Sequence, residues 1–212
     1  MNSLVKFQIK SIGFNFYIPI IIALSLMIYL LGFYNSKFDA QFFLVLQIIF
    51  VPSISLWSSL LVYSLYHENS EEIMIQLPSQ KIAKYNAYFI SLFSLLIVIL
   101  VTIFCIKSES FSFISLFLLL FTQSLILSIT SFLSSILFKS VEVSLLIVIM
   151  YCGSEGLTGG KLIPWPHIFY FDTQFTIKII IINLFVTLIY LSICTWISIK
   201  YLRTIERRIP FI

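Results

Sequence analysis

The chain has 212 residues, of which 60% are hydrophobic and only 10% are charged. A soluble domain of this length carries about 25% charged residues, so the excess apolar surface here must face lipid, and soluble classes of protein are excluded. The net charge of +4 is small, and no nucleic-acid partner is expected. This composition predicts an all-α integral membrane protein with a single transmembrane domain over residues 1–212.

The first thirteen residues mix Lys6, Gln8 and Lys10 with apolar side chains, which is typical of a helix lying at the membrane interface. A frayed tail is the alternative. Six apolar runs follow, and each is tested against a hydrocarbon core ~30 Å thick, which ~20 helical residues cross at ~1.5 Å per residue. The predicted spans, in chain order, are residues 14–34, 42–66, 83–106, 111–138, 141–158 and 176–201.

The fourth predicted span is unusual in its hydroxyl groups. Ser124, Ser128, Ser131 and Ser135 fall at steps of four, three and four, so they share one face of a helix. Such a face allows close helix packing and interhelical hydrogen bonds. The alternative interpretation is a polar lining for a translocation path.

The fifth apolar run has only twelve residues, from Val141 to Cys152, before the sequence GSEGLTGG. Twelve residues give ~18 Å of helix, which is too short to cross. Either the span continues through the glycines to Thr158, or it breaks there and forms a re-entrant segment. The residues that follow, up to the sixth span, combine two prolines with aromatic side chains, which indicates an aromatic belt.

The distribution of positive charge predicts the topology. With six spans and the N-terminus inside, nine of the thirteen Lys and Arg residues fall on the inner side, which favours a multi-pass protein of the cell membrane with both termini cytoplasmic. The inner residues are Lys6, Lys10, Lys81, Lys84, Lys139, Lys200, Arg203, Arg207 and Arg208, and the outer ones are Lys37, Lys107, Lys161 and Lys178.

The polar segment 67–84, HENSEEIMIQLPSQKIAK, would then face the cytoplasm between the second and third spans. Its middle can form a short amphipathic helix, with Ser70 as N-cap and Glu71 and Glu72 in the first turn, where the helix dipole favours acidic side chains. Ile73 and Leu77 lie one turn apart on such a helix. A helix of this kind could dock into a partner protein.

Motifs for catalysis are not apparent in this sequence. It lacks the G-x-x-x-x-G-K-[ST] loop of nucleotide-binding proteins, so no ATPase of its own is expected. Glu71-Glu72 is similar to the paired glutamates of CAAX-type intramembrane proteases, but the arginine and intramembrane histidines of those enzymes are missing. No catalytic residue is expected. No metal site is expected either, because the three cysteines are far apart, form no C-x-x-C pair and have no histidine at metal-ligand spacing.

Glu155 is an acid close to apolar sequence, where ionisable groups are costly and often functional. It could line the exit of a path or pair with Lys161. A solvated helix end at the interface is the alternative. Trp165, in the aromatic segment that follows, is a second candidate for an outer gate.

The combination of six spans, inner termini and this cytoplasmic segment resembles the membrane subunit of an ABC-2 type exporter (type V exporter). In that family the connection between the second and third spans begins with an acidic residue, passes through a short helix that ends near a proline, and reaches a lysine. The usual Gly-Thr before the helix is replaced here by Glu71-Glu72. The residues that carry the resemblance are Glu68, Glu71, Glu72, Ile73, Met74, Leu77, Pro78 and Lys81.

The resemblance implies that this segment is a coupling helix docked on a separate ABC ATPase subunit, which would bind ATP and Mg. It also implies a second permease copy or a homologous permease as partner, outer re-entrant helices between the fifth and sixth spans, and no cofactor in this chain. Short outer segments look like those of small permeases that export amphipathic peptides, as in lantibiotic immunity or modulin export. The alternatives are a non-transporting immunity or assembly protein and a secondary transporter.

Overall fold

The structure is a computed structural model that describes residues 12–63, 79–108, 111–159, 169–171 and 177–206, and every element in these ranges is helical. Six of its helical segments are long and apolar enough to cross a membrane. The elements are η1 (Gly13–Tyr17), α2 (Ile18–Gly32), η2 (Ser36–Phe38), α3 (Asp39–Val45), η3 (Leu46–Phe50), η4 (Val51–Ser53), α4 (Ile54–Tyr63), α6 (Ser79–Lys107), α7 (Phe113–Phe138), α8 (Val141–Thr158) and α9 (Ile177–Glu206). The predicted all-α fold, with six helices able to cross a membrane, is confirmed for the described residues.

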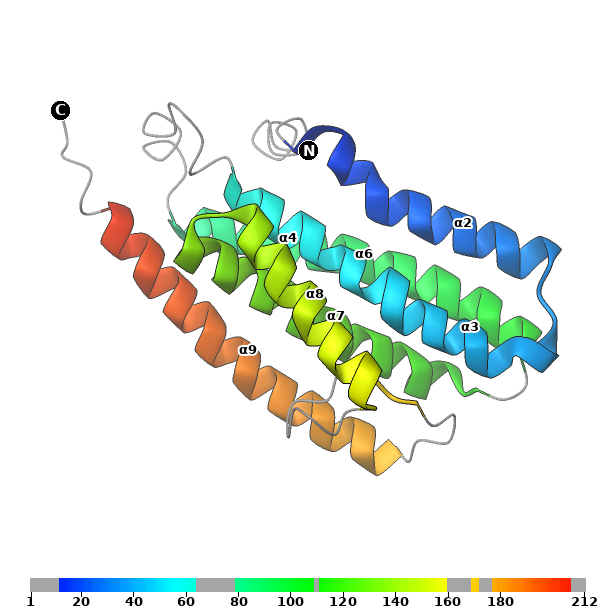
Figure 1. Ribbon diagram of the computed structural model, residues 1–212. Coiled ribbons are helices and arrows are strands. Elements are labelled where there is room, and N and C mark those ends of the chain that lie inside the picture. The colour runs from blue at the N-terminus through cyan, green and yellow to red at the C-terminus, as the bar shows by residue number, and fades with distance from the viewer. Residues whose placement is uncertain (1–11, 64–78, 109–110, 160–168, 172–176, 207–212) are drawn as a thin grey trace.

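The bundle is organised around α7, which packs against α4, α6, α8 and α9 (Figure 1). Its residues from Leu119 to Ile129 are almost all buried. Helix α2 contacts α6 and the η3 segment, whereas α9 lies on the opposite side against α7 and α6. Helices α2 and α9 are therefore the outer members of the bundle.

The bundle has two ends, each named here after one of its residues. The Lys139 end holds the start of α2, the end of α4, the start of α6, the turn between α7 and α8, and the end of α9 (Figure 1). The Asp39 end holds the turns between α2 and α3 and between α6 and α7, the end of α8 and the start of α9.

Helix α8 continues through the glycines and ends at Thr158. Its 18 residues correspond to ~27 Å of helix, which is close to the thickness of the hydrocarbon core. The side chain of Ser140 caps the helix by accepting from the N–H of Val143, and Gly159 ends it with a φ of 60°, a conformation that glycine adopts readily. Of the two alternatives for the fifth span, the one in which the helix breaks at the glycines is therefore wrong. The re-entrant helices predicted after it fall mainly on residues outside the described ranges.

The second span is interrupted near its middle. Leu46–Phe50 is a π-helical turn, and the 3-10 turn Val51–Ser53 follows it. Pro52 lacks an N–H and its ring would clash with a carbonyl of the preceding turn, so a regular α-helix cannot pass through this point. The extra residue of the π turn shifts the facing of the residues before Pro52. This span also begins at Ser36, earlier than the predicted residue 42.

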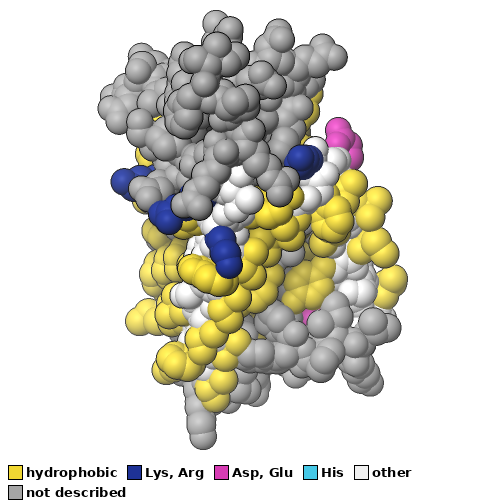
Figure 2. Space-filling view, turned by 90° about the vertical axis from the view of Figure 1, so that its left-hand side faces the viewer, with side chains coloured by type: hydrophobic (Ala, Val, Ile, Leu, Met, Phe, Trp, Pro, Cys, Tyr) yellow, Lys and Arg dark blue, Asp and Glu magenta, His cyan; other side chains and the backbone are white. Residues whose placement is uncertain are grey.

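The outer surface of the bundle is largely hydrophobic (Figure 2). Leu157 is 91% exposed and Ile149 is 69% exposed on α8, and Phe185 is 65% exposed on α9. Figure 2 shows Lys and Arg side chains gathered in a band toward one end, with hydrophobic side chains below them. This pattern is typical of a protein whose middle faces lipid and whose end faces water.

Candidate functional site

Buried polar side chains fasten a short segment, Phe169–Phe171, to the Asp39 end of the bundle. Gln47, from the π turn, donates from Nε2 to the carbonyl of Tyr170 at 2.9 Å and accepts from the N–H of Tyr170 at 2.8 Å. Gln123 of α7 donates to the same Gln47 Oε1 at 2.8 Å. Both glutamine side chains are fully buried.

Glu155 is the third member of this group. Its Oε2 accepts a hydrogen bond from the N–H of Phe169 at 2.9 Å, and the side chain is 0% exposed, so it is not the solvated helix end considered above. A buried carboxylate is costly unless hydrogen bonds compensate it. We call Gln47, Gln123 and Glu155, together with the Phe169–Tyr170 backbone, the polar clamp.

The surroundings of the polar clamp also change the pKa of Tyr170, the tyrosine that it holds. Burial raises the pKa of the Tyr170 hydroxyl, and the nearby Glu155 carboxylate raises it further. The polar clamp thus connects three helical elements, the π turn, α7 and α8, to this segment.

A second buried carboxylate joins two turns at the Asp39 end. Asp39 accepts from the hydroxyl of Tyr34 and, at 2.6 Å, from the hydroxyl of Ser108. Tyr34 follows α2 and Ser108 follows α6. Asp39 and the polar clamp thus hold the connections at this end of the bundle close to the helices.

The four serines of the predicted face, Ser124, Ser128, Ser131 and Ser135, are almost completely buried in α7, with exposures of at most 2%. Ser128 is hydrogen-bonded to Ser58 of α4 at 2.7 Å, and Ser131 donates to the carbonyl of Ser55 at 2.8 Å. Ser124 and Ser135 donate to carbonyls of their own helix. In this conformation the serine face lies against neighbouring helices of the same chain.

We call the serine contacts of α7 with its neighbouring helices the serine seam. Helix α8 joins it through Ser144, which was not predicted from the sequence. Ser144 donates to the carbonyl of Ser131 at 2.7 Å and accepts from Ser134 at 2.9 Å. Because serine is small, helices carrying it can approach closely, and the hydroxyls then find partners across the contact. The hydroxyls therefore tie α4, α7 and α8 into one unit.

An apolar groove of about 590 Å³ runs between α8 on one side and α2 with the second span on the other. The hydroxyls of Ser53 and Ser55 on its floor are already bonded to backbone carbonyls of Phe50 and Pro52, so they offer little to a polar ligand. Phe169 of the polar clamp lines the groove at the Asp39 end. The other lining residues are Ile22, Ile48, Ile49, Pro52, Leu56, Leu145, Val148, Ile149, Cys152, Gly153, Gly156 and Leu157.

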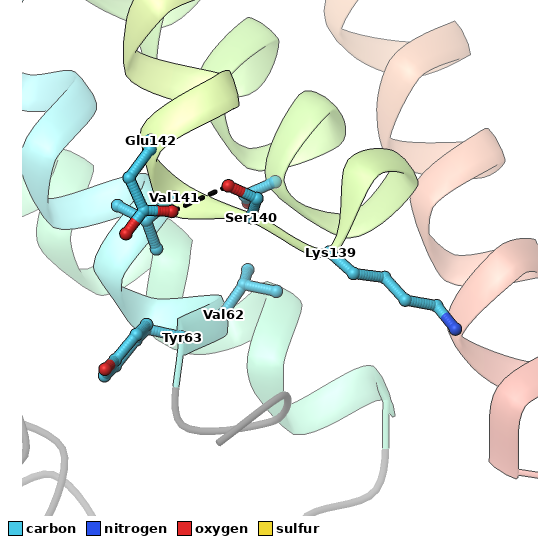
Figure 3. Close-up of a pocket in the computed structure, with 7 residues that line it drawn as sticks. Val62, Tyr63, Lys139, Ser140, Val141 and Glu142 are labelled. Atoms are coloured by element: carbon cyan, nitrogen blue, oxygen red, sulfur yellow. Dashed lines mark hydrogen bonds between the residues drawn. The ribbon is translucent and has the colours of Figure 1, made fainter.

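A smaller cavity of about 70 Å³ lies at the Lys139 end, where the α7–α8 turn meets the end of α4 (Figure 3). Val62 and Tyr63 line it from α4. Ser140 donates from Oγ to Glu142 at 2.7 Å across its rim, whereas Lys139 extends away from Glu142 (Figure 3). The cavity adjoins the point where the chain leaves α4 toward the predicted coupling segment.

The predicted coupling residues Glu68, Glu71, Glu72, Ile73, Met74, Leu77 and Pro78 lie outside the described residues, as does Trp165. Lys81 falls in the first turn of α6, and its side chain is outside the described part. Of the predicted path residues, the structure places Glu155 in the polar clamp and the four α7 serines in the seam. It does not bring these two sets together in one site.

Gln47 and Gln123 were not singled out from the sequence. One signal was present: a proline inside a predicted span, at position 52, marks an irregular helix, and such irregularities often occur at functional sites. A glutamine five residues before that proline, within an apolar run, is then a candidate for a polar contact.

Comparisons of the chain with protein-family models, curated proteins and solved structures found no match. The fold therefore defines the class directly: a multi-pass helical membrane protein with six candidate spans. Within the described residues, no cluster of three or more potential metal-ligating side chains is present.

Proposed function

We propose that this chain is the membrane-spanning permease subunit of an ATP-driven exporter of the ABC-2 type, which moves hydrophobic or amphipathic peptides or lipid-like molecules out of the cell or the membrane. The observation that supports it most is the apolar groove beside α8, which opens along the hydrophobic surface and ends at the polar clamp. A molecule that already partitions into the bilayer can reach such a groove sideways.

In this proposal two permease copies, or this chain and a homologous permease, associate with two ABC ATPase subunits at the cytoplasmic side. The ATPases bind ATP and Mg, and their closure moves the segment 68–78 and with it α4 and α6. Because buried hydrogen bonds of serine hydroxyls join α4, α7 and α8, these helices move together. This chain contributes no catalytic residue.

The polar clamp serves as the outer gate in the same scheme. It holds Phe169 and Tyr170 at the Asp39 end through three hydrogen bonds, two from Gln47 of the π turn and one from Glu155 of α8, and Gln123 of α7 holds Gln47 through a fourth. Separating those elements would break several of the bonds together. Gate opening would thus be linked to the relative movement of the π turn, α7 and α8.

The first experiment is co-purification of the full chain with candidate ABC ATPase subunits, followed by ATP hydrolysis of the complex. The test variant is Glu68→Lys with Glu72→Lys, and the matched control is Glu142→Lys, because Glu142 is an exposed acid at the Lys139 end. We expect the double variant to lose ATPase binding and the control to keep it. Failure of the wild-type chain to recruit any ATPase would favour the non-transporting immunity or assembly protein.

A further inference from the structure

Helix α9 presents a continuous exposed face whose chemistry changes along its length. Phe185, Ile189 and Ile193 are 65%, 46% and 54% exposed and follow one another one turn apart. Trp196, 63% exposed, continues the same face. Lys200 and Arg203 come next at steps of four and three, so they extend the face toward the Lys139 end.

The basic end of this face is hollowed. A pocket of about 410 Å³ is lined by Trp196, Ile199, Lys200, Arg203 and Thr204. The Lys200 ammonium lies 5.0 Å from the centre of the Trp196 ring, which is within the range of a cation–π contact. This contact holds the lysine at the level of the tryptophan.

The side chains that line this pocket carry two positive charges, on Lys200 and Arg203, and no negative charge. Lys139, at the end of the neighbouring helix α7, extends away from Glu142 and adds a further cation at this end of the bundle (Figure 3). The band of Lys and Arg in Figure 2 is consistent with this excess.

The length of the apolar part matches one leaflet of a bilayer. From Trp196 to Phe185 the helix rises ~16 Å at ~1.5 Å per residue, against ~15 Å for half of a ~30 Å hydrocarbon core. Tryptophan favours the level of the headgroups, where its ring is apolar and its N–H is hydrated. The order along the face is therefore acyl chain, interface and phosphate.

We propose that this face of α9 is a binding site for an anionic phospholipid of the leaflet at the Lys139 end, with the phosphate between Lys200 and Arg203, the glycerol region beside Trp196 and an acyl chain along Phe185, Ile189 and Ile193. Basic side chains just outside a span attract anionic lipids, whereas zwitterionic lipids lack the net charge. The site is independent of the proposed export function.

The test is quenching of tryptophan fluorescence in vesicles of phosphatidylcholine that contain either brominated phosphatidylglycerol or brominated phosphatidylcholine. The full chain has three tryptophans, so the variant Trp196→Phe identifies the part of the signal that arises at this site. The test variant is Lys200→Gln with Arg203→Gln. The matched control, Lys37→Gln with Lys107→Gln, removes two exposed positive charges at the Asp39 end.

We expect the wild-type chain to favour brominated phosphatidylglycerol by about fivefold for each basic side chain that contacts it. The preference should fall to about one in the test variant and persist in the control. Equal quenching by both brominated lipids in the wild-type chain would overturn the proposal. So would a preference that survives in the test variant, or one that soluble inorganic phosphate competes away, because free phosphate would then be the ligand.

Discussion

The side chain of Gln47 pairs with both backbone polar groups of Tyr170, which lies 123 residues further along the chain. The amide side chain forms the same two hydrogen bonds that a neighbouring β-strand would form: its Nε2 donates to the carbonyl of Tyr170, and its Oε1 accepts from the N–H. Peptide groups at the end of a span are costly to bury unpaired, so a single side chain that satisfies both fixes the position of the segment it holds.

Replacing Gln47 by leucine should therefore loosen the polar clamp. The change leaves the N–H and carbonyl of Tyr170 without this partner, and each such buried group costs about 1–3 kcal/mol. We expect Gln47→Leu to lower the melting temperature of the purified protein. The reaction of the three cysteines with a thiol-specific dye on heating measures this temperature. Ile48→Leu, at an exposed neighbour, is the control and should melt like the wild type.

The serine seam predicts a strong dependence on side-chain size at Ser144. Ser144→Ala removes the hydrogen bond donated to Ser131 and the one accepted from Ser134, and should cost about 0.6–1.7 kcal/mol, from the average to the maximum found for one such bond within a membrane. Ser144→Leu should cost more, because the added atoms would have to enter the contact between α7 and α8. The control is Ser192→Leu, since Ser192 is exposed and bonds only to its own helix. Thermal unfolding in detergent measures the stability of all three variants. Equal destabilisation by Ser144→Leu and Ser192→Leu would contradict close packing of α7 and α8 at Ser144.

Gly153 offers a direct test of the apolar groove. A Cβ added there meets no atom within 4 Å, so the position tolerates a side chain. Gly153→Ala should stabilise α8 by about 0.8–1 kcal/mol through its higher helix propensity. Gly153→Phe should fill part of the groove while the melting temperature stays near that of the wild type. Under the proposed export function, it should also reduce ATP-dependent export of a hydrophobic peptide in vesicles that contain the chain and its ATPase. Unchanged export by Gly153→Phe would show that the groove is not part of the transport path.

The predicted orientation can be checked with single cysteines in a cysteine-free chain. Lys107→Cys lies at the Asp39 end, and Lys139→Cys lies at the Lys139 end. With both termini cytoplasmic, a membrane-impermeant thiol reagent should label the first in intact cells and the second only after permeabilisation. The reverse result would invert the topology and place the polar clamp inside the cell.

The sequence predicted the number and approximate position of the spans because burial in hydrocarbon is a requirement on each helix separately. Runs of apolar residues satisfy it locally, and their lengths can be read directly. The start of the second span was placed late because Ser36 to Gln41 is polar enough to be interpreted as a turn. In the structure, Asp39 in that stretch is compensated by Tyr34 and Ser108.

The polar clamp could not be predicted in the same way. Gln47, Gln123 and Glu155 belong to three different spans, and only their packing brings them to one segment of backbone. The course of α8 past Gly153 was also left open, because glycine lowers helix propensity by about 1 kcal/mol per residue without forbidding a helix. In the structure α8 continues through the glycines to Thr158 and packs against α7 and α4.

The two-residue turn between α7 and α8 has a consequence for how the chain enters the membrane during synthesis. Helix α8 is the least hydrophobic of the six spans, and only Lys139, with φ of 53°, and Ser140 separate it from α7. Entering as a hairpin would let Ser144 form its hydrogen bonds to α7 before lipid surrounds it. In a translocation assay with glycosylation tags, α8 alone should insert poorly, and the α7–α8 pair should insert efficiently.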